Sequence, residues 1–302
     1  MNQAPSNAKY FIGLYWVAVW QGMIGVLAKW ITWNPAATVC MRCAISAIGL
    51  ALLCRLRGSR LTGGGRVRVL TMVGGLLLAV HWGTLFWAYT ITDVGPVVIC
   101  VFTFPIMISV IEPWFFGERP QFSAVGGAIL MFVGIVLLQA LAPAEKQGVG
   151  GSYFLGSMLA LFSAACFGAR NVLSRLLLKH GNAVVLMRWQ TATATLVLLP
   201  GLWWVEPAQV TLDQLGLLLV LGLFFTALPH TVAVWAMHGL SATTVGIVGS
   251  QQVVAGILFA WLLLNEQLHA GVFAGAALVL AAVVWQSVAH WRPPEVAVVS
   301  DG

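Results

Sequence analysis

The fold is decided by the stretch Pro96–Gly134, which reads PVVICVFTFPIMISVIEPWFFGERPQFSAVGGAILMFVG. It consists of an apolar run, a short charged break at Glu118–Arg119 and a second apolar run that opens with glycines. A weaker copy follows 148 positions later, where Val97 falls on Val245 and Glu118 falls on Glu266. The predicted function depends on whether this repeat is real and on how its two copies are oriented.

The composition of the chain is that of a membrane protein. Of its 302 residues, 60% are hydrophobic and 8% are charged, whereas soluble domains contain about 25% charged residues. The formal net charge of +6 does not predict a nucleic-acid partner, because most Lys and Arg residues lie beside apolar runs, where they report orientation in a bilayer. The five cysteines lie inside apolar segments, so Cys40 and Cys43 are not taken as a metal site. We expect a lipid bilayer as partner and no cofactor or metal.

Ten apolar runs are long enough to cross the bilayer. Crossing about 30 Å of hydrocarbon takes roughly 20 helical residues, and only a helix pairs its own backbone polar groups there. The predicted fold class is therefore an all-α integral membrane protein with ten transmembrane helices. The predicted helices are Tyr10–Trp30, Ala36–Cys54, Val67–Tyr89, Gly95–Phe116, Phe122–Ala140, Tyr153–Leu173, Ala183–Trp203, Leu212–Met237, Ala242–Leu263 and Gly271–His290.

Basic residues predict how the chain is oriented. Arg55, Arg57, Arg60, Arg66 and Arg68 surround the connection between the second and third predicted helices, and further basic residues follow the sixth and the tenth. The opposite loops carry acidic residues such as Glu206 and Asp213. By the positive-inside rule, both termini are predicted to lie in the cytoplasm and the protein in the inner membrane.

The repeat extends over all ten predicted helices. Five consecutive segments match in order at offsets of 143 to 148 positions, as in Phe11 with Phe154 and Trp87–Ala88 with Trp235–Ala236. Because each half has an odd number of spans, the halves would insert with opposite orientation. We predict two inverted five-helix repeats, residues 8–141 and 152–290, followed by a cytoplasmic tail, residues 291–302. Inverted repeats are typical of secondary transporters with a substrate site near the midplane.

With both halves identified, the chain resembles the drug/metabolite transporter superfamily, specifically the ten-helix proteins built from two EamA domains. The resemblance covers roughly residues 11–286. It is carried by Arg42 and Arg188 early in the second helix of each half, by Trp87–Ala88 and Trp235–Ala236, by the run from Pro105 to Arg119, and by the looser second copy from Leu262 to Gln267. The resemblance implies a small-molecule carrier, typically an exporter of amino acids, related metabolites or toxic compounds. It also implies that the last helix of each half lies outside the central cavity.

Three ionisable residues within the spans are candidate gating or ion-pair residues, because charges in the membrane are costly: Arg42, Glu112 and Arg188. Each arginine could meet a substrate carboxylate or form an ion pair that breaks during transport. Alternatively, each could simply extend to the interface from its place near a helix end. Glu112 could be a proton site or a gate partner, or it could pair with Arg42 or with a basic residue on the cytoplasmic side.

Seven further residues are candidates for binding substrate: Trp20, His81, Trp82, Phe104, His230, Gln251 and Gln252. His81 and His230 lie at equivalent levels of the third and eighth predicted helices, where an imidazole could contact a substrate carboxylate or carry a proton. Deep tryptophans would suit an apolar, aromatic or cationic substrate. The alternative is structural, since a single His or Trp in a helix often only packs or hydrogen-bonds within the bundle.

We therefore predict a secondary transporter that works by alternating access and exports amino-acid-like or aromatic and hydrophobic metabolites. The alternatives are a multidrug or toxic-compound efflux carrier and a membrane receptor or scaffold that transports nothing. The chain has no G-x-x-x-x-G-K-[ST] motif for ATP and no nucleophile–base motif, so neither a pump driven directly by ATP nor an enzyme is predicted. The glycines that open the fifth and tenth predicted helices fit either internal packing or the interface of a homodimer.

Overall fold

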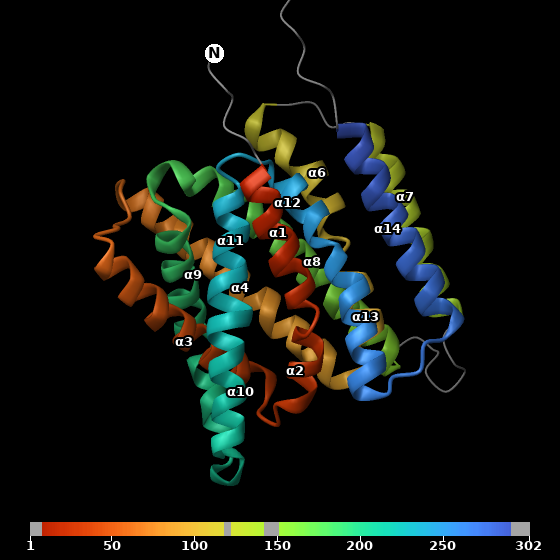
Figure 1. The fold of residues 1–302 in the computed structure, drawn as a ribbon, viewed down its shortest axis with the longest axis horizontal. Helices are drawn as coiled ribbons and strands as arrows, with labels where there is room; N and C mark the ends of the chain where they lie inside the picture. The colour runs from red at the N-terminus through yellow and green to blue at the C-terminus, as the bar shows by residue number, and fades with distance from the viewer. Residues whose placement is uncertain (1–7, 118–121, 142–150, 291–302) are drawn as a thin grey trace, which may run out of the picture.

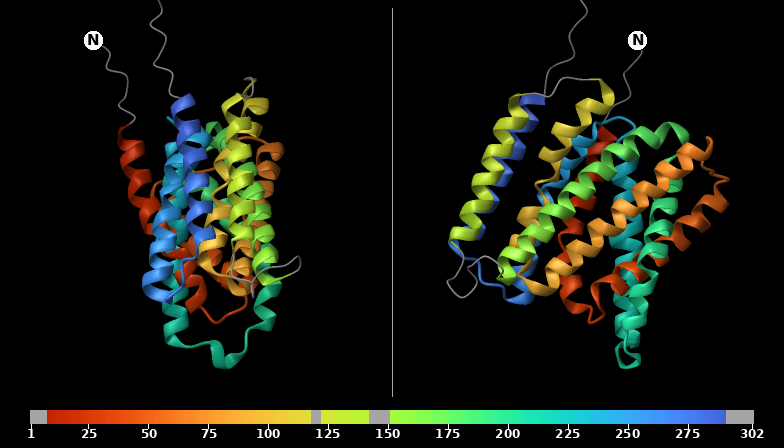
Figure 2. Two further views of the ribbon diagram at one scale, coloured as in Figure 1. Left: turned by 90° about the vertical axis from the view of Figure 1, so that its right-hand side faces the viewer. Right: turned by 180° about the vertical axis from the view of Figure 1, so that it is seen from behind.

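The computed structural model describes residues 8–117, 122–141 and 151–290. Within these residues, all regular secondary structure is helical, and the helices lie side by side as one bundle (Figures 1 and 2). The main helices are α1 (Ala8–Gln21), α2 (Ile24–Trp30), α3 (Pro35–Leu56), α4 (Gly65–Ile91), α5 (Val94–Val101), α6 (Phe104–Phe116), α7 (Phe122–Ala140), α8 (Ser152–Leu177), α9 (Ala183–Leu198), α10 (Leu212–Gly222), α11 (Leu228–Ala236), α12 (Ala242–Gly249), α13 (Gln251–Leu264) and α14 (Ala270–His290). We call α1 to α7 the N-terminal half and α8 to α14 the C-terminal half.

Eight helical segments of the described chain are long and apolar enough to cross a membrane. They coincide with eight of the ten predicted spans, and their ends differ from the predicted ends by at most two residues, except that the sixth predicted span ends at His180 and not at Leu173. The other two predicted spans fall on α7 and α14, of which 19 and 21 residues are helical. Some side chains of these two helices lie outside the described residues. The predicted cytoplasmic tail also lies outside them.

The spans around the centre of the bundle are interrupted at three places. Two of these breaks fall beside Gly22 and Pro105, residue types that indicate bending of a membrane helix, whereas the break at Ser250 is not predicted. The break between α5 and α6 lies at Phe102–Thr103, where Pro105 has no N–H to continue the hydrogen-bond ladder and the Thr103 hydroxyl donates to the Cys100 carbonyl. The break between α12 and α13 lies at Ser250, whose hydroxyl donates to the Ile247 carbonyl. Such local bonds compete with the helix ladder. α5 and α12 are both eight residues long.

A third break separates α1 from α2 at Gly22–Met23. A Cβ atom on Gly22 would lie 2.6 Å from the Ala255 Cβ and 2.9 Å from the Gly256 nitrogen. Only a glycine therefore allows α1 to approach α13 this closely. The break leaves Gln21 at the end of α1, in the middle of the bundle.

A π-helical turn (Leu223–Ala227) joins α10 to α11. A π-turn adds a residue to the helical turn, and such turns occur frequently at functional sites. Here the Phe225 carbonyl and the Thr226 hydroxyl both contact the side chain of Arg42.

Helices α7 and α14 form a separate pair at one edge of the bundle (Figures 1 and 2). Their glycines allow the two backbones to approach closely. A Cβ added to Gly134 would lie 3.4 Å from the Gly275 carbonyl oxygen, and a Cβ added to Gly275 would lie 3.2 Å from the Gly134 carbonyl oxygen. This close packing is typical of small residues in membrane helices. Gly275 of the glycine-rich opening of α14 thus packs between the two halves, and the homodimer stays a prediction.

Candidate functional site

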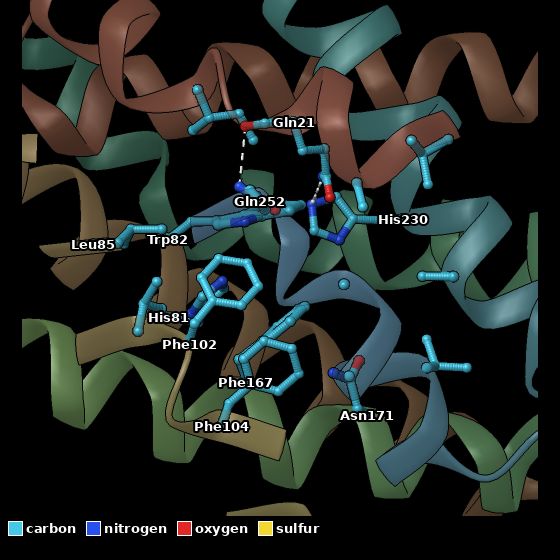
Figure 3. Close-up of a pocket in the computed structure, with 18 of the residues that line it drawn as sticks. Gln21, His81, Trp82, Leu85, Phe102, Phe104, Phe167, Asn171, His230 and Gln252 are labelled. Atoms are coloured by element: carbon cyan, nitrogen blue, oxygen red, sulfur yellow. Dashed lines mark hydrogen bonds between the residues drawn. The ribbon is translucent and has the colours of Figure 1, made fainter. Parts of the chain in front are cut away.

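A cavity lies at the centre of the bundle and receives side chains from both halves (Figure 3). Its volume is about 70 Å³, much less than the roughly 300 Å³ at which small-molecule pockets begin. At this size the cavity is too small to hold a metabolite. The polar and aromatic residues that line it are Gln21, His81, Trp82, Tyr89, Phe102, Phe104, Phe167, Asn171, His230 and Gln252.

His81 of α4 is fixed against α8 by a short hydrogen-bond network. Its Nδ1 lies 2.7 Å from the Ser163 hydroxyl oxygen and 3.0 Å from the Ser163 carbonyl oxygen. The Ser163 hydroxyl donates its proton to the His81 carbonyl, at 2.8 Å, so Nδ1 has to be the nitrogen that bears hydrogen. In the neutral ring Nε2 is then an acceptor. The ring also stacks on Phe167, with 4.4 Å between centroids.

His230 of α11 lies across the cavity from α4 and faces Trp82 edge-on, with 4.9 Å between ring centroids. Its Nε2 lies 3.3 Å from the amide nitrogen of Gln21, which can only donate, so Nε2 accepts. The side-chain amide of Gln252 donates to the backbone carbonyl of Gln21, at 3.0 Å. Figure 3 shows this chain of polar groups along one wall and the phenylalanine rings along the other.

Five of the seven predicted substrate-binding residues line this cavity: His81, Trp82, Phe104, His230 and Gln252. Trp20 does not. It is half-exposed and stacks on Phe225 in an apolar groove on the outer surface of the bundle. Successive residues of a helix point about 100° apart, so Gln21 is directed inward and its neighbour Trp20 outward. Gln251 does not line the cavity either, because its amide donates to the Val248 carbonyl beside the helix break.

Two lining residues of α8 were not predicted. Ser163, Phe167 and Asn171 follow one another at four-residue spacing and form a single stripe on the helix, whose last two members line the cavity. The spacing alone could have indicated this face. Ser163 and Arg170 are also seven residues apart, close to two helical turns, so Arg170 could be taken as a member of the same stripe.

Arg170 is fully buried instead. Its guanidinium donates to the Gln190 side-chain oxygen at 2.8 Å and to the Asn171 side-chain oxygen at 2.9 Å, and it also contacts the Met187 sulfur. All of these partners are neutral. Because Asn171 lines the cavity, the Arg170 charge lies one side chain behind the cavity wall.

Arg42 is also fully buried and forms no ion pair within the described residues. Its guanidinium donates to the Thr226 hydroxyl at 2.7 Å and to the Phe225 carbonyl at 3.3 Å. Its carbon Cζ lies 4.4 Å from the Trp82 ring centroid, and its Nη1 has no hydrogen-bond partner. Arg42 thus lies behind Trp82 of the cavity wall as a buried cation and does not reach the membrane interface.

Arg188 does not match Arg42 in position. Helices α3 and α9 both begin after an asparagine whose side chain caps the helix, Asn34 and Asn182, which lie 148 positions apart. In this register Arg42 corresponds to Gln190, two residues after Arg188. A shift of two residues turns a side chain by about 200° around a helix, so Gln190 is buried while Arg188 faces a hollow at the end of α3.

Glu112 of α6 holds the start of α12. Its two carboxylate oxygens accept hydrogen bonds from the backbone nitrogens of Ala242 and Thr243, at 2.9 and 3.1 Å, and from the Thr243 hydroxyl at 2.6 Å. Arg175, near the end of α8, donates to the same carboxylate at 2.6 Å. We call these four residues the Glu112 clasp. The partner of Glu112 is thus a basic residue other than Arg42, and Glu112 does not line the cavity.

Glu266 forms a related contact at the opposite end of the bundle. Its carboxylate accepts hydrogen bonds from the backbone nitrogens of Val94, at 2.9 Å, and Gly95, at 3.4 Å, at the start of α5. Burial raises the pKa of the Glu266 carboxyl, and Asp93 also raises it, whereas the backbone hydrogen bonds and Lys29 lower it. We call Glu266, Val94 and Gly95 the Glu266 clasp. Both carboxylates satisfy free N–H groups and the positive end of the helix dipole.

The two clasps connect the halves in opposite senses. The Glu112 clasp joins α6 of the N-terminal half to α12 of the C-terminal half, and the Glu266 clasp joins the turn after α13 to α5 of the N-terminal half. The first residues of the two capped helices, Val94 and Ala242, lie 148 positions apart. In Figure 1 the end of α6 and the end of α13 lie at opposite ends of the bundle.

Membrane-length apolar helices from two halves of a chain that surround a central cavity are typical of membrane transport proteins. The chain belongs to the EamA-like transporter family, whose model matches it twice, at residues 9–139 and 154–288. This confirms the predicted family, and the protein is a multi-pass membrane transporter rather than an enzyme.

The chain is similar to named relatives and to a solved structure. It is 24% identical over 206 residues to the uncharacterized transporter YoaV of Bacillus subtilis (strain 168), over 67% of this chain and 70% of the relative. It is 27% identical over 251 residues to the pseudopaline exporter CntI of Pseudomonas aeruginosa (strain UCBPP-PA14), over 83% of this chain and 85% of the relative. A structure described as "Crystal structure of protein" shares the fold, with a TM-score of 0.71, 18% identity, and coverage of 93% of this chain and 97% of that chain.

Proposed function

We propose that this protein is a secondary transporter that exports a small amino-acid-like or aromatic metabolite across the inner membrane by alternating access. In this proposal ten transmembrane helices form two inverted five-helix repeats, residues 8–141 and 152–290, with both termini in the cytoplasm. The two matches of the family model and the constant spacing of 148 positions between the asparagine caps and between α5 and α12 support the repeat.

The observation that carries the proposal is the cavity itself. It lies between the halves, with His81 and Trp82 from one half and Phe167 and His230 from the other. Aromatic rings provide an apolar surface for a substrate side chain, and the imidazole and amide groups provide a few fixed hydrogen-bonding groups, as in most small-molecule sites. A rigid-body movement of one half against the other would widen this space.

The clasps support alternating access. Each carboxylate is carried by one half and held by the other, so opening the bundle at either end has to break the clasp at that end. With both clasps formed, the cavity is only about 70 Å³. We propose that outward and inward opening each release one clasp while the other stays closed, which would keep the two open states similar in energy.

Two buried cations support a substrate with a negative group. Arg42 and Arg170 each lie one side chain from the cavity, behind Trp82 and Asn171 respectively, and within the described residues neither has an acidic partner. Burying a charge without a counter-ion is costly. A carboxylate in the cavity would be attracted to both positive charges, and charges interact more strongly in this low-dielectric interior than in water.

The alternative is multidrug or toxic-compound efflux, which the predominance of aromatic rings in the cavity also suits. The name of the relative CntI, a pseudopaline exporter, favours export of a metabolite. A receptor or scaffold that transports nothing would not require a cavity supplied by both halves, and it is the weaker alternative.

Flux through reconstituted liposomes tests the proposal. Amino acids, aromatic acids and their uncharged or cationic analogues are loaded inside, and release is compared with protein-free liposomes. Trp82→Ala and His81→Ala should lower release of the transported compound at least tenfold, whereas Trp87→Ala, a half-exposed tryptophan on the same helix, should not. No flux of any compound by folded protein would reject transport. Preferred flux of the cationic analogues would reject the negatively charged substrate.

A further inference from the structure

A second hollow of about 520 Å³ lies at the end of α3, away from the central cavity. Three arginines face it from three different parts of the chain: Arg55 in the last turn of α3, Arg60 in the following connection and Arg188 of α9. Arg55 and Arg60 belong to the N-terminal half and Arg188 to the C-terminal half. The mechanism of transport proposed above does not use them.

These three positive charges have no acidic partner among the residues that the structure describes. Five acidic residues fall within the described ranges, and four of them lie in or beside turns at the opposite end of the bundle: Asp93, Glu206, Asp213 and Glu266. The fifth, Glu112, is fully engaged in its clasp. Like charges gathered without counter-ions repel one another, so an anion that enters the hollow relieves this repulsion.

The chemistry of the hollow fits a phosphate group. A guanidinium presents a planar fork of N–H donors that matches phosphate oxygens. Ser59 also faces the hollow, and its hydroxyl oxygen already accepts a hydrogen bond from the Asn182 amide at 3.1 Å. The Ser59 hydroxyl proton is therefore available to a further acceptor.

The surroundings favour the phosphate of a lipid over a soluble phosphate. The hollow is partly walled by Leu52 of α3. Ile48, Leu52 and Leu56 follow at four-residue spacing and are all exposed on the outer surface of the helix, so an apolar stripe runs from the hollow along the bilayer-spanning helix. A headgroup in the hollow would place its acyl chain on this stripe. Basic pockets between membrane helices on the cytoplasmic side bind anionic headgroups in this way.

We propose that this hollow binds the phosphate headgroup of an anionic phospholipid, which bridges Arg55 and Arg60 of one half to Arg188 of the other. The end of α3, where the hollow lies, is at the same end of the bundle as the end of α6, which carries Glu112 (Figures 1 and 2). A lipid held there stabilises the arrangement in which this end is closed.

The experiment uses the full chain, purified in a neutral detergent. Native mass spectrometry measures retention of phosphatidylglycerol against phosphatidylcholine of the same acyl composition, and the midpoint of thermal unfolding is followed with each lipid and with soluble glycerol phosphate. We expect selective retention of phosphatidylglycerol and an upward shift of the midpoint with this lipid alone. Arg60→Ala and Arg188→Ala should each weaken retention about fivefold, the effect of one basic residue near an anionic headgroup.

Arg57→Ala is the matched control, since Arg57 is an exposed residue of the same connection that does not face the hollow. It should leave retention unchanged. Arg55→Ala, at another exposed position, repeats the test should Arg188→Ala fail to fold. Equal retention of phosphatidylcholine, an equal loss with Arg57→Ala, or an equal shift with glycerol phosphate would each overturn the proposal.

Discussion

Replacing Glu112 with glutamine should open the end of the bundle that the Glu112 clasp holds. Glutamine has the shape of glutamate but keeps one acceptor oxygen, and four donors converge on the carboxylate. In the least costly arrangement the amide nitrogen faces Thr243, whose hydroxyl can turn to accept from it. The Thr243 backbone N–H then loses its partner, and Arg175 loses the negative charge of its ion pair.

The expected magnitude follows from these two losses. An unsatisfied buried N–H costs about 1–3 kcal/mol, and a bond to a charged group exceeds a neutral one by roughly 1 kcal/mol. Arg175 is partly exposed, so solvent reduces its share. We therefore expect a loss of about 2–3 kcal/mol in the closed state, which corresponds to a roughly 30- to 160-fold shift toward opening at this end.

Cysteine labelling measures this shift. Gly249 lines the cavity, and a Cβ placed there meets no atom within 4 Å, so Gly249→Cys reports access. Cys166 is replaced by serine, because it is the native cysteine that is not fully buried. In Glu112→Gln, a membrane-impermeant maleimide should label Gly249→Cys faster from the side of the Glu112 clasp only. Glu266→Gln is the mirror control and should increase labelling from the opposite side. An unchanged rate, or the same increase from both sides, would refute the clasp mechanism.

Two predictions concern stability. Gly75→Ala should lower the free energy of unfolding by about 1–3 kcal/mol, because its Cβ would lie 2.7 Å from the Gln190 backbone oxygen. The control is Gly83→Ala on the same helix, whose Cβ meets no atom closer than 4.0 Å and which should not lower it. Equal thermal midpoints for the two variants would contradict this expectation. The Glu266 carboxyl has a raised pKa, so the folded state binds its proton more tightly than the unfolded chain does. Its contribution to stability is complete below the ordinary value of 4.5 and is lost as pH rises through the raised pKa; Glu266→Gln should remove this part of the pH dependence of the midpoint, and identical profiles for variant and wild type would exclude it.

Much of the helical architecture could be predicted, because a membrane-length apolar run has only one way to pair its backbone. The helix breaks were harder to predict. Pro105 indicates a bend because it has no N–H, but at Ser250 the break depends on a side-chain hydroxyl that competes with the backbone hydrogen bonds. Such competition is decided by packing around the residue and leaves no periodic signal in the sequence.

The site residues were predicted where their position within the helix was clear from spacing, as for His81 and Trp82. They were missed where two registers competed. Arg42 and Arg188 lie in similar short sequences, and aligning them places the repeats two residues closer together than the helix caps do. The caps, Asn34 and Asn182, lie 148 positions apart. A shift of two residues nearly reverses the face of a helix, so Arg188, predicted as a gating or ion-pair residue or as one that extends to the interface, faces the hollow at the end of α3.

The pairing of α7 with α14 has a consequence for how the protein is made. α7 leaves the ribosome about 150 residues before α14 does, a delay of roughly 7 to 30 s at 5–20 residues per second. During this interval Gly134 of α7 has no Gly275 backbone to pack against, and the N–H groups at the start of α5 lack the Glu266 carboxylate that accepts their hydrogen bonds. The Glu112 carboxylate, by contrast, is already present when α12 is synthesised. The N-terminal half is therefore completed only by the last part of the chain, and a nascent chain that stops before α14 leaves a small-residue surface open to other helices in the membrane.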